Sequence, residues 1–132
     1  MNNTILVIED NEQNLYLATF LLEKAGFKVV PARSGLEGIE LAGRIQPALI
    51  ILDIQLPQMD GYSVARELRR NPGLDDVSIV AVTSYAMVGD RERALESGCN
   101  GYIEKPIKPD IFIDQIKSYI KIFPGDGSGG GA

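Results

Sequence analysis

The chain has 132 residues, 45% of them hydrophobic, and its 13 basic and 18 acidic residues give a net charge of −5. This length fits one domain with an ordinary core, and the acidic balance disfavours direct nucleic-acid binding, since the short basic run Arg69-Arg70 fits a solvated helix end. The absence of histidine and the single cysteine, Cys99, exclude an internal disulfide, a His-based zinc site and a Ser-His or Cys-His nucleophile pair.

The first two predicted units are each a strand followed by a helix. A strand at residues 4–8 precedes a helix that ends before Gly26, a residue suited to a helix C-terminus. A strand at 28–30 precedes a helix that opens with the capping-box sequence Ser34-Gly35-Leu36-Glu37. The expected apolar positions of these two helices are Leu15, Ala18, Leu22 and Ala25 in the first, and Leu36 and Ile39 in the second.

The remaining predicted units follow the same order. A strand at 48–52 precedes a helix for which Asp60 is the expected N-cap. Strands at 78–82 and 101–103 precede two further helices, the first of them at about 90–97. The expected apolar positions of these three helices are Val64, Ala65 and Leu68, then Ala94 and Leu95, then Ile113, Ile116 and Ile120.

Alternating strands and helices predict a doubly wound α/β fold, in which five helices cover the two faces of a five-stranded parallel sheet. The strand at 48–52 scarcely alternates between apolar and polar residues, which is typical of a strand buried on both faces. We expect the flavodoxin-like strand order 2-1-3-4-5. The domain is expected to span residues 1–123, and the Gly-rich segment 124–132 is predicted to be a flexible tail, either an added segment or the start of a linker.

Membrane and export signals are missing from the sequence. Its longest apolar stretch, near residues 48–52, is far shorter than the roughly 20 residues that span a bilayer. Residues 1–4 lack the charged start and the apolar segment of a secretion signal. We therefore expect a cytoplasmic protein with no membrane partner.

Polar groups follow four of the five predicted strands. In an open parallel sheet, sites form outside the carboxyl ends of the strands, so these groups are expected at one rim. They are Glu9-Asp10, Asp53, Thr83-Ser84 and Glu104-Lys105-Pro106. Taken alone, each has a plainer interpretation, as a solvated or helix-capping pair, a turn residue, a β-forming residue and a surface lysine. Their joint placement at the strand ends favours a functional site.

The carboxylates Glu9, Asp10 and Asp53 would repel one another at this rim unless one is protonated or a cation joins them. Oxygen ligands without histidine or cysteine favour Mg²⁺, with Mn²⁺ as the alternative, and Mg²⁺ readily takes phosphate oxygens as further ligands. A carboxylate at position 53 can attack a phosphoryl group and form an acyl phosphate. Lys105 and the Thr83 hydroxyl are expected to reach that phosphate.

At these residues the sequence resembles the response-regulator receiver family, which is also called CheY-like. The likeness extends from Thr4 to about Phe123, and narrower features between Ala86 and Cys99 resemble DivK-type single-domain regulators and receivers attached to hybrid kinases. Four stretches in order carry the resemblance: Ile5 to Asn11, Leu52 to Gly61, Val80 to Met87 and Gly98 to Pro106.

The resemblance implies a role for each matching position. Asp53 matches the phosphoacceptor, Glu9 and Asp10 the acidic pair that holds Mg²⁺, and the Gln55 backbone carbonyl a further metal ligand. The remaining matches are Thr83 as the switch hydroxyl, Lys105 as the phosphate-pairing lysine, Tyr102 as the aromatic that rotates inward on activation, and Pro106 as the proline that follows a cis peptide bond from Lys105. Tyr85, together with Gln55, is expected to influence the lifetime of the acyl phosphate.

The function that the resemblance implies is a receiver in a two-component phosphorelay. A sensor histidine kinase or a histidine phosphotransfer protein would donate a phosphoryl group from phosphohistidine to Asp53, and the altered conformation would control a downstream protein. Such a protein is a signalling switch that turns over no separate substrate. It is expected to be a monomer or a phosphorylation-dependent dimer.

Two other classes share parts of this pattern. A metal-dependent phosphohydrolase also uses an aspartate nucleophile and Mg²⁺, but its common arrangement places a second acid where this chain has Gln55. A flavin-binding module has the same sheet topology, but its phosphate requires donors where this chain has the acidic Glu9-Asp10-Asn11. Turnover of small phosphate esters would identify the first class, and a yellow colour of the purified protein the second.

Overall fold

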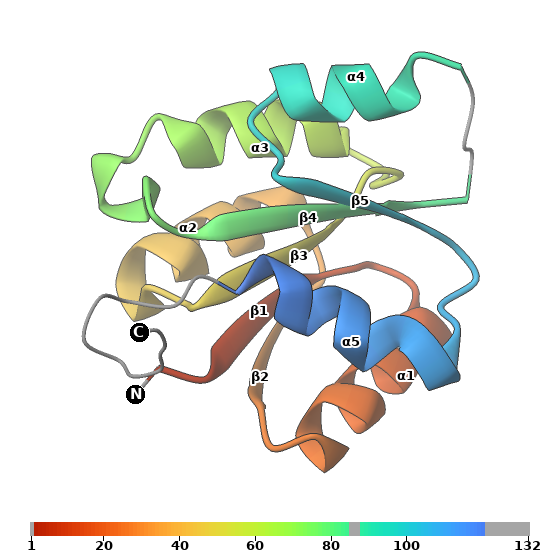
Figure 1. Cartoon of the computed structure of the whole chain (residues 1–132). Helices are drawn as coiled ribbons and strands as arrows, with labels where there is room; N and C mark the ends of the chain where they lie inside the picture. The colour runs from red at the N-terminus through yellow and green to blue at the C-terminus, as the bar shows by residue number, and fades with distance from the viewer. Residues whose placement is uncertain (1, 85–87, 121–132) are drawn as a thin grey trace.

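The computed structural model describes residues 2–84 and 88–120, so Tyr85 and the predicted tail, 124–132, lie outside the described residues. The five predicted strands form a parallel sheet in the predicted order, β2-β1-β3-β4-β5 (Figure 1). The strands are β1 (Thr4–Ile8), β2 (Lys28–Ala32), β3 (Leu49–Asp53), β4 (Ser78–Thr83) and β5 (Gly101–Glu104). The helices are α1 (Glu12–Lys24), α2 (Gly35–Ile45), α3 (Gly61–Arg69), α4 (Asp90–Glu96) and α5 (Pro109–Tyr119), with a short 3₁₀ helix η1 (Pro72–Leu74).

The sheet separates two hydrophobic clusters, one on each face. Successive residues of a strand point to opposite faces, so Leu6 and Ile8 of β1 contact the cluster under α2 and α3, whereas Ile5 and Val7 contact the cluster under α1 and α5. Figure 1 shows the same division, with α1 and α5 on one side of the sheet and α2, α3 and α4 on the other. All of β3 is buried, as expected for a central strand covered on both faces.

Capping groups fix the starts of three helices. The side chains of Asn11 and Asp60 accept hydrogen bonds from backbone N–H groups in the first turns of α1 and α3. At α2, Ser34 Oγ accepts from the Glu37 N–H at 3.1 Å. The Glu37 carboxylate accepts from the Arg33 N–H at 2.7 Å, so the return bond of the predicted capping box lies one residue before the N-cap.

Three residues that the apolar spacing placed toward the core are exposed instead. Leu36 is 70% exposed and Leu95 is 47% exposed, and Ala25 lies beyond the last turn of α1 at the surface. In α2 the residues that face the core are small, because a Cβ at Gly38 would overlap the Ile8 side chain. The helix therefore approaches the sheet through its glycines. Leu36 points outward, whereas Ile39, Leu41 and Ile45 are partly buried against the core.

Arg69 is another correction, because the run Arg69-Arg70 is not simply a solvated helix end. The Arg69 guanidinium donates hydrogen bonds of 2.7–2.9 Å to four acceptors, which are the carbonyls of Leu74, Val77 and Gly98 and the Asn100 side chain. Arg70, in contrast, has a largely exposed side chain. Arg69 thus joins the end of α3 to η1, to the approach to β4 and to the segment before β5.

Helix α4 has the least apolar attachment to the rest of the domain. Ala94 is its one buried residue. The guanidinium of Arg93 lies over the ring of Tyr62 in α3, 4.2 Å from the ring centroid, and supplies a cation–π contact between the two helices. Within the parts of the chain that the structure describes, no helix has both the length and the apolar character needed to cross a membrane.

Candidate functional site

Three carboxylates meet at the carboxyl rim of the sheet. Asp53 is the last residue of β3, and Glu9 and Asp10 follow β1 directly. Because Ile8 pairs with Leu52 across these neighbouring strands, the chain brings Glu9 beside Asp53. One oxygen from each of the three carboxylates lies within 4.8 Å of the others. Glu9 and Asp53 are buried, at 5% and 2% exposure, whereas Asp10 is open to solvent.

Lys105 reaches this cluster from the edge strand β5. It follows β5, and its Nζ lies 3.1 Å from Glu9 Oε1 and 3.4 Å from Asp53 Oδ2. The lysine side chain is only 10% exposed. Its backbone N–H donates to the Thr83 carbonyl at 2.7 Å, and the Lys105–Pro106 peptide bond is cis, the geometry that the resemblance implied. The ammonium group therefore lies between two buried carboxylates.

The crowding of these groups changes the pKa of Glu9. Burial, together with the neighbouring Asp53, raises the pKa of the Glu9 carboxyl to about 7, and Lys105 opposes this increase. A carboxyl group that retains its proton near neutral pH, beside a second buried carboxylate, marks a place where one more positive charge would be stabilising. Perturbed groups of this kind are typical of functional sites.

The backbone next to Asp53 is closely packed. A Cβ at Gly61 would overlap the backbone of Ile54 and would lie 2.8 Å from the Asp53 carbonyl oxygen. The Gly61 N–H donates to the Ile54 carbonyl at 2.9 Å. Glycine at position 61 thus allows the first turn of α3 to lie against the end of β3, and this close approach fixes the backbone that carries Asp53.

The donor set of this cluster fits a hard divalent cation. Carboxylate oxygens from Glu9, Asp10 and Asp53 are close enough to share one ion, and the chain has no histidine to compete as a ligand. Asp10 supplies an exposed oxygen, so an ion held here would keep contact with water, as Mg²⁺ does in most protein sites. The cluster thus has the ligands that Mg²⁺ and other hard divalent cations take.

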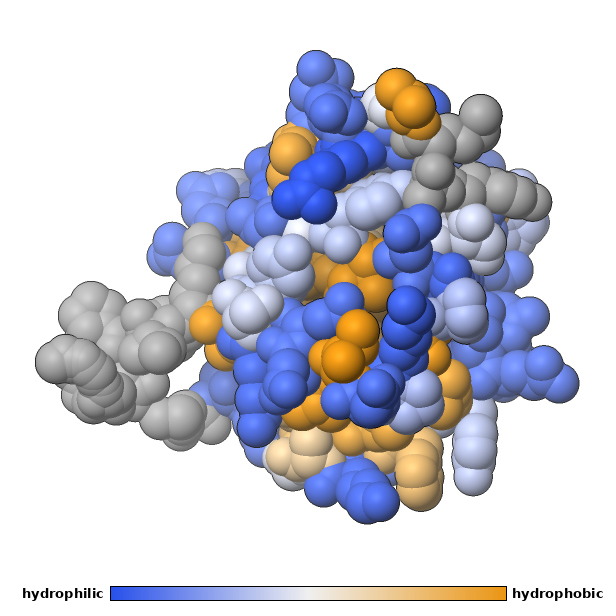
Figure 2. Space-filling view, turned by 45° about the vertical axis from the view of Figure 1, so that its right-hand side comes forward, coloured by the Kyte–Doolittle hydropathy of each residue, from blue (hydrophilic) through white to orange (hydrophobic). Residues whose placement is uncertain are grey.

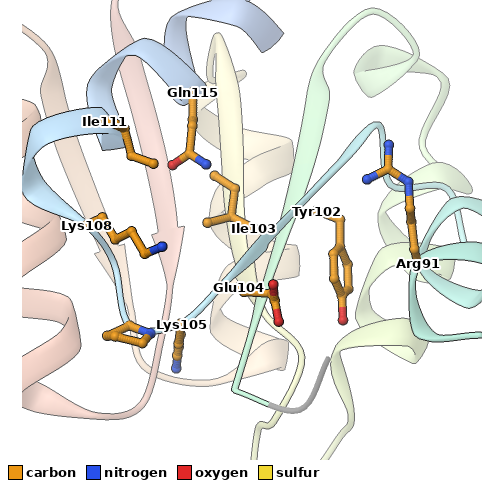
Figure 3. A pocket seen from close by; sticks show the side chains of 9 residues that line it. Arg91, Tyr102, Ile103, Glu104, Lys105, Lys108, Ile111 and Gln115 are labelled. Atoms are coloured by element: carbon orange, nitrogen blue, oxygen red, sulfur yellow. The ribbon is translucent and has the colours of Figure 1, made fainter. Parts of the chain in front are cut away.

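The other predicted residues lie around this cluster at different distances. Thr83 ends β4 beside Asp53, since Asp53 pairs with Val82, and it is 2% exposed. Tyr102 lies farther along, on β5, and lines a pocket of about 510 Å³ among α4, β5 and α5. In the view of Figure 3, the Tyr102 ring lies between the side chains of Arg91 in α4 and Glu104 in β5. On this side of the molecule, hydrophobic atoms are visible between hydrophilic ones (Figure 2).

One contact at the site escaped the sequence analysis. Gln55 was expected to be a metal ligand through its backbone carbonyl and to influence the lifetime of the acyl phosphate, but its side-chain Oε1 also accepts a hydrogen bond from the Ser84 N–H at 3.0 Å. Its own N–H donates to Asp53 Oδ1 at 2.9 Å. The partners in the first bond are 29 residues apart, so no local pattern in the sequence signals it.

Comparison with known families agrees with this geometry. Residues 5–117 match the family described as "Response regulator receiver domain". The polar-differentiation response regulator DivK of Brucella ovis is 42% identical over 120 residues, which cover 91% of this chain and 98% of that protein. The family match therefore covers β1 from its second residue, the other four strands completely, and the acids and the lysine of the rim.

Solved structures show the same fold. The receiver domain of a sensor histidine kinase from Pseudomonas aeruginosa PAO1, with a magnesium ion coordinated in its active-site cleft, superposes with a TM-score of 0.83 at 33% identity, covering 91% of this chain and 98% of that one. A response regulator from Burkholderia pseudomallei with a phosphorylated aspartic acid and a calcium ion gives a TM-score of 0.79 at 27% identity, covering 91% of this chain and 67% of that one.

Proposed function

This chain belongs to the response regulator receiver domain family, which acts in two-component signalling, and on that premise we propose that Asp53 is its phosphoacceptor. The observation that carries the proposal is the position of Asp53. It is a buried carboxylate at the end of a central strand, grouped with two other carboxylates and 3.4 Å from the Lys105 ammonium group. No other aspartate among the described residues has all of these neighbours.

The proposed reaction is the transfer of a phosphoryl group from a phosphohistidine to this carboxylate. An Asp53 side-chain oxygen forms the new bond to phosphorus as the phosphorus–nitrogen bond of the donor breaks, and the imidazole leaves with the electron pair of that bond. Most of the catalysis in such a transfer comes from positioning and charge stabilisation. The Gln55 N–H holds the carboxylate through Oδ1, and the close packing of Gly61 holds the backbone.

Glu9, Asp10 and Asp53 would hold Mg²⁺ together with the Gln55 backbone carbonyl. The ion supplies positive charge that offsets the negative charge of the phosphoryl oxygens. Lys105 would supply a second positive charge, and its low exposure keeps that charge poorly screened by water. Loss of either charge is expected to slow phosphorylation.

The switch would act through Thr83 and Tyr102. A phosphate on Asp53, with a charge near −2, attracts the Thr83 hydroxyl and Lys105 and shifts an equilibrium between two conformations. Tyr102 would then rotate inward and change the surface formed by α4, β5 and α5. The single buried residue of α4 makes that helix easy to displace.

Receiver domains interact with sensor histidine kinases and with downstream targets. For this chain we propose a histidine kinase or a histidine phosphotransfer protein as the donor and a protein, not nucleic acid, as the target. The chain would work in the cytoplasm as a switch without a separate substrate. It would be a monomer that dimerises, if at all, only when phosphorylated.

Phosphorylation by a small phosphodonor tests the central assignment. Wild-type protein incubated with acetyl phosphate and Mg²⁺ should gain one phosphoryl group by intact-protein mass spectrometry, and Asp53→Asn should gain none, because an amide is not a nucleophile toward phosphorus. Asp76→Asn is the matched control, since Asp76 is exposed and lies outside the cluster. Labelling of Asp53→Asn equal to wild type would rule out Asp53 as the acceptor.

A further inference from the structure

The peptide unit between Thr83 and Ser84 is held at both of its polar atoms. Its carbonyl oxygen accepts from the Lys105 N–H at 2.7 Å, and its N–H donates to the Gln55 side chain at 3.0 Å. Both partners lie next to the acid cluster. This single peptide unit therefore joins the ends of three strands, β3, β4 and β5.

Gln55 contacts the phosphoacceptor as well as this peptide unit. Its backbone N–H donates to Asp53 Oδ1 at 2.9 Å. Gln55 thus contacts the Asp53 carboxylate through its backbone N–H and the Ser84 N–H through its side chain. Because Ser84 directly follows the proposed switch residue Thr83, Gln55 links the reacting carboxylate to the segment that must respond to it.

We propose that Gln55 is a positioning residue whose side chain restrains the Thr83–Ser84 peptide unit while Asp53 is unphosphorylated, and that phosphorylation releases this restraint. The proposal rests on the assignment of Asp53 as the phosphoacceptor. It adds a side-chain role to Gln55, beside the backbone role already proposed for it. The restraint opposes the conformational change and so sets the level of activity without phosphate.

The direction of the effect follows from the charge of the Asp53 side chain. The bond from the Gln55 N–H to a carboxylate is charge-assisted, and such bonds are roughly twice as strong as those to neutral acceptors. Phosphorylation turns the Asp53 carboxylate into an acyl phosphate, whose carbonyl group is neutral and whose negative charge lies on the phosphoryl oxygens. The Gln55 backbone is then held less firmly, while the phosphate attracts Thr83, and the Ser84 N–H is free to leave the Gln55 side chain.

Gln55→Met tests the restraint, since methionine keeps the length of the side chain and removes the acceptor. Beryllofluoride with Mg²⁺ serves as the stable phosphoryl mimic, and binding is followed by backbone amide NMR. One hydrogen bond contributes modestly to a conformational equilibrium, so the variant should bind beryllofluoride about fivefold more tightly than wild type. Gln58→Met, an exposed glutamine in the same β3–α3 connection, should bind as wild type does.

A second readout separates the restraint from a general effect on the fold. Hydrogen exchange of the Ser84 amide should be faster in Gln55→Met and in beryllofluoride-bound wild type, and unchanged in Gln58→Met. Affinity of Gln55→Met equal to or weaker than wild type, or an unchanged Ser84 exchange rate, would overturn the restraint. Failure of wild-type protein to bind beryllofluoride, with Asp53→Asn behaving identically, would overturn the phosphoacceptor assignment instead.

Discussion

The buried Glu9 side chain supplies a carboxylate to the acidic cluster, and its ionisation lowers the stability of the folded protein. It is buried beside Asp53, and its raised pKa means that the folded protein holds a proton there that the unfolded chain releases at lower pH. Without a metal ion, its contribution to stability is fully present below the ordinary pKa of 4.5 and is lost as the pH rises toward about 7. Above that range the folded protein contains an extra buried negative charge that a divalent ion can offset.

Mg²⁺ affinity should therefore depend on pH. Binding requires the ionised Glu9 carboxylate, so below a pKa of about 7 each ion bound must displace a proton. We expect the affinity to fall by up to about tenfold per pH unit below that value and to level off above it. Titrations followed by the backbone amides of Asp53 and Gln55 at a series of pH values measure this directly.

Glu9→Gln provides the comparison for that experiment. The amide cannot titrate, so the variant should bind Mg²⁺ more weakly and with little pH dependence near neutrality. Equal pH dependence in both proteins would show that another group controls the metal affinity.

Sequence patterns predicted the acids of this site and missed part of their surroundings. Asp53 ends a strand, and Glu9 and Lys105 each follow one directly. The carboxyl ends of parallel strands share one edge, so topology alone brings these residues together. The Gln55 side chain bonds to a backbone N–H 29 residues away, and any polar side chain of suitable length can make such a bond. Its partner depends on the loop conformation, which apolar periodicity does not describe.

At the scale of the elements, α2 shows why the strands were predicted more accurately than the buried faces of the helices. Strand positions follow from runs of β-branched residues, and the structure confirms all five. The spacing of Leu36 and Ile39 predicted an apolar face for α2. Ile39 does pack against the core, but Leu36 is exposed, and Gly35 and Gly38 are buried because the helix lies too close to Val64 and Ile8 for larger residues there. Small residues give a weak hydrophobic signal, so a close helix–sheet contact is easily assigned to the wrong face.

Arg69 adds hydrogen bonds between elements that also share one hydrophobic cluster. Its guanidinium holds the carbonyls of Leu74, Val77 and Gly98, and Asn100 extends the network because its Oδ1 also accepts from the Ile79 N–H at 2.8 Å. Partial burial lowers the pKa of Arg69, which reflects the desolvation of the charge. The charge is nevertheless well satisfied, because each of its acceptors lies within hydrogen-bonding distance.

Arg69→Met should destabilise the domain, since it removes the donor for these carbonyl groups while it keeps much of the aliphatic packing. We expect the free energy of unfolding to fall by about 3 kcal/mol. Urea denaturation followed by circular dichroism gives the value. Arg70→Met changes the adjacent, largely exposed arginine and should stay within about 0.5 kcal/mol of wild type. Similar losses in the two variants would mean that the Arg69 network contributes little.

At the scale of the whole molecule, ion pairs at the carboxyl ends of the strands connect β5 with β1 and β3. Strands β1 and β3 supply the acids, and Lys105, at the end of the edge strand β5, spans β4 to reach them. Because the lysine and a bound cation act on the same carboxylates, each partly replaces the other. The stability of the fold and the occupancy of the metal site are therefore linked.

Lys105→Met tests this linkage. Removal of one partner from a buried ion pair leaves uncompensated charge, so in EDTA at about pH 8 the variant should lose about 3 kcal/mol of unfolding free energy. The loss should shrink in saturating Mg²⁺, which restores positive charge, and at about pH 5, where Glu9 holds its proton. Lys108→Met, at an exposed lysine nearby, should change little under any of these conditions. A loss for Lys105→Met that is the same with EDTA and with Mg²⁺ would show that the lysine acts by packing alone, because only a charge effect can be replaced by another cation.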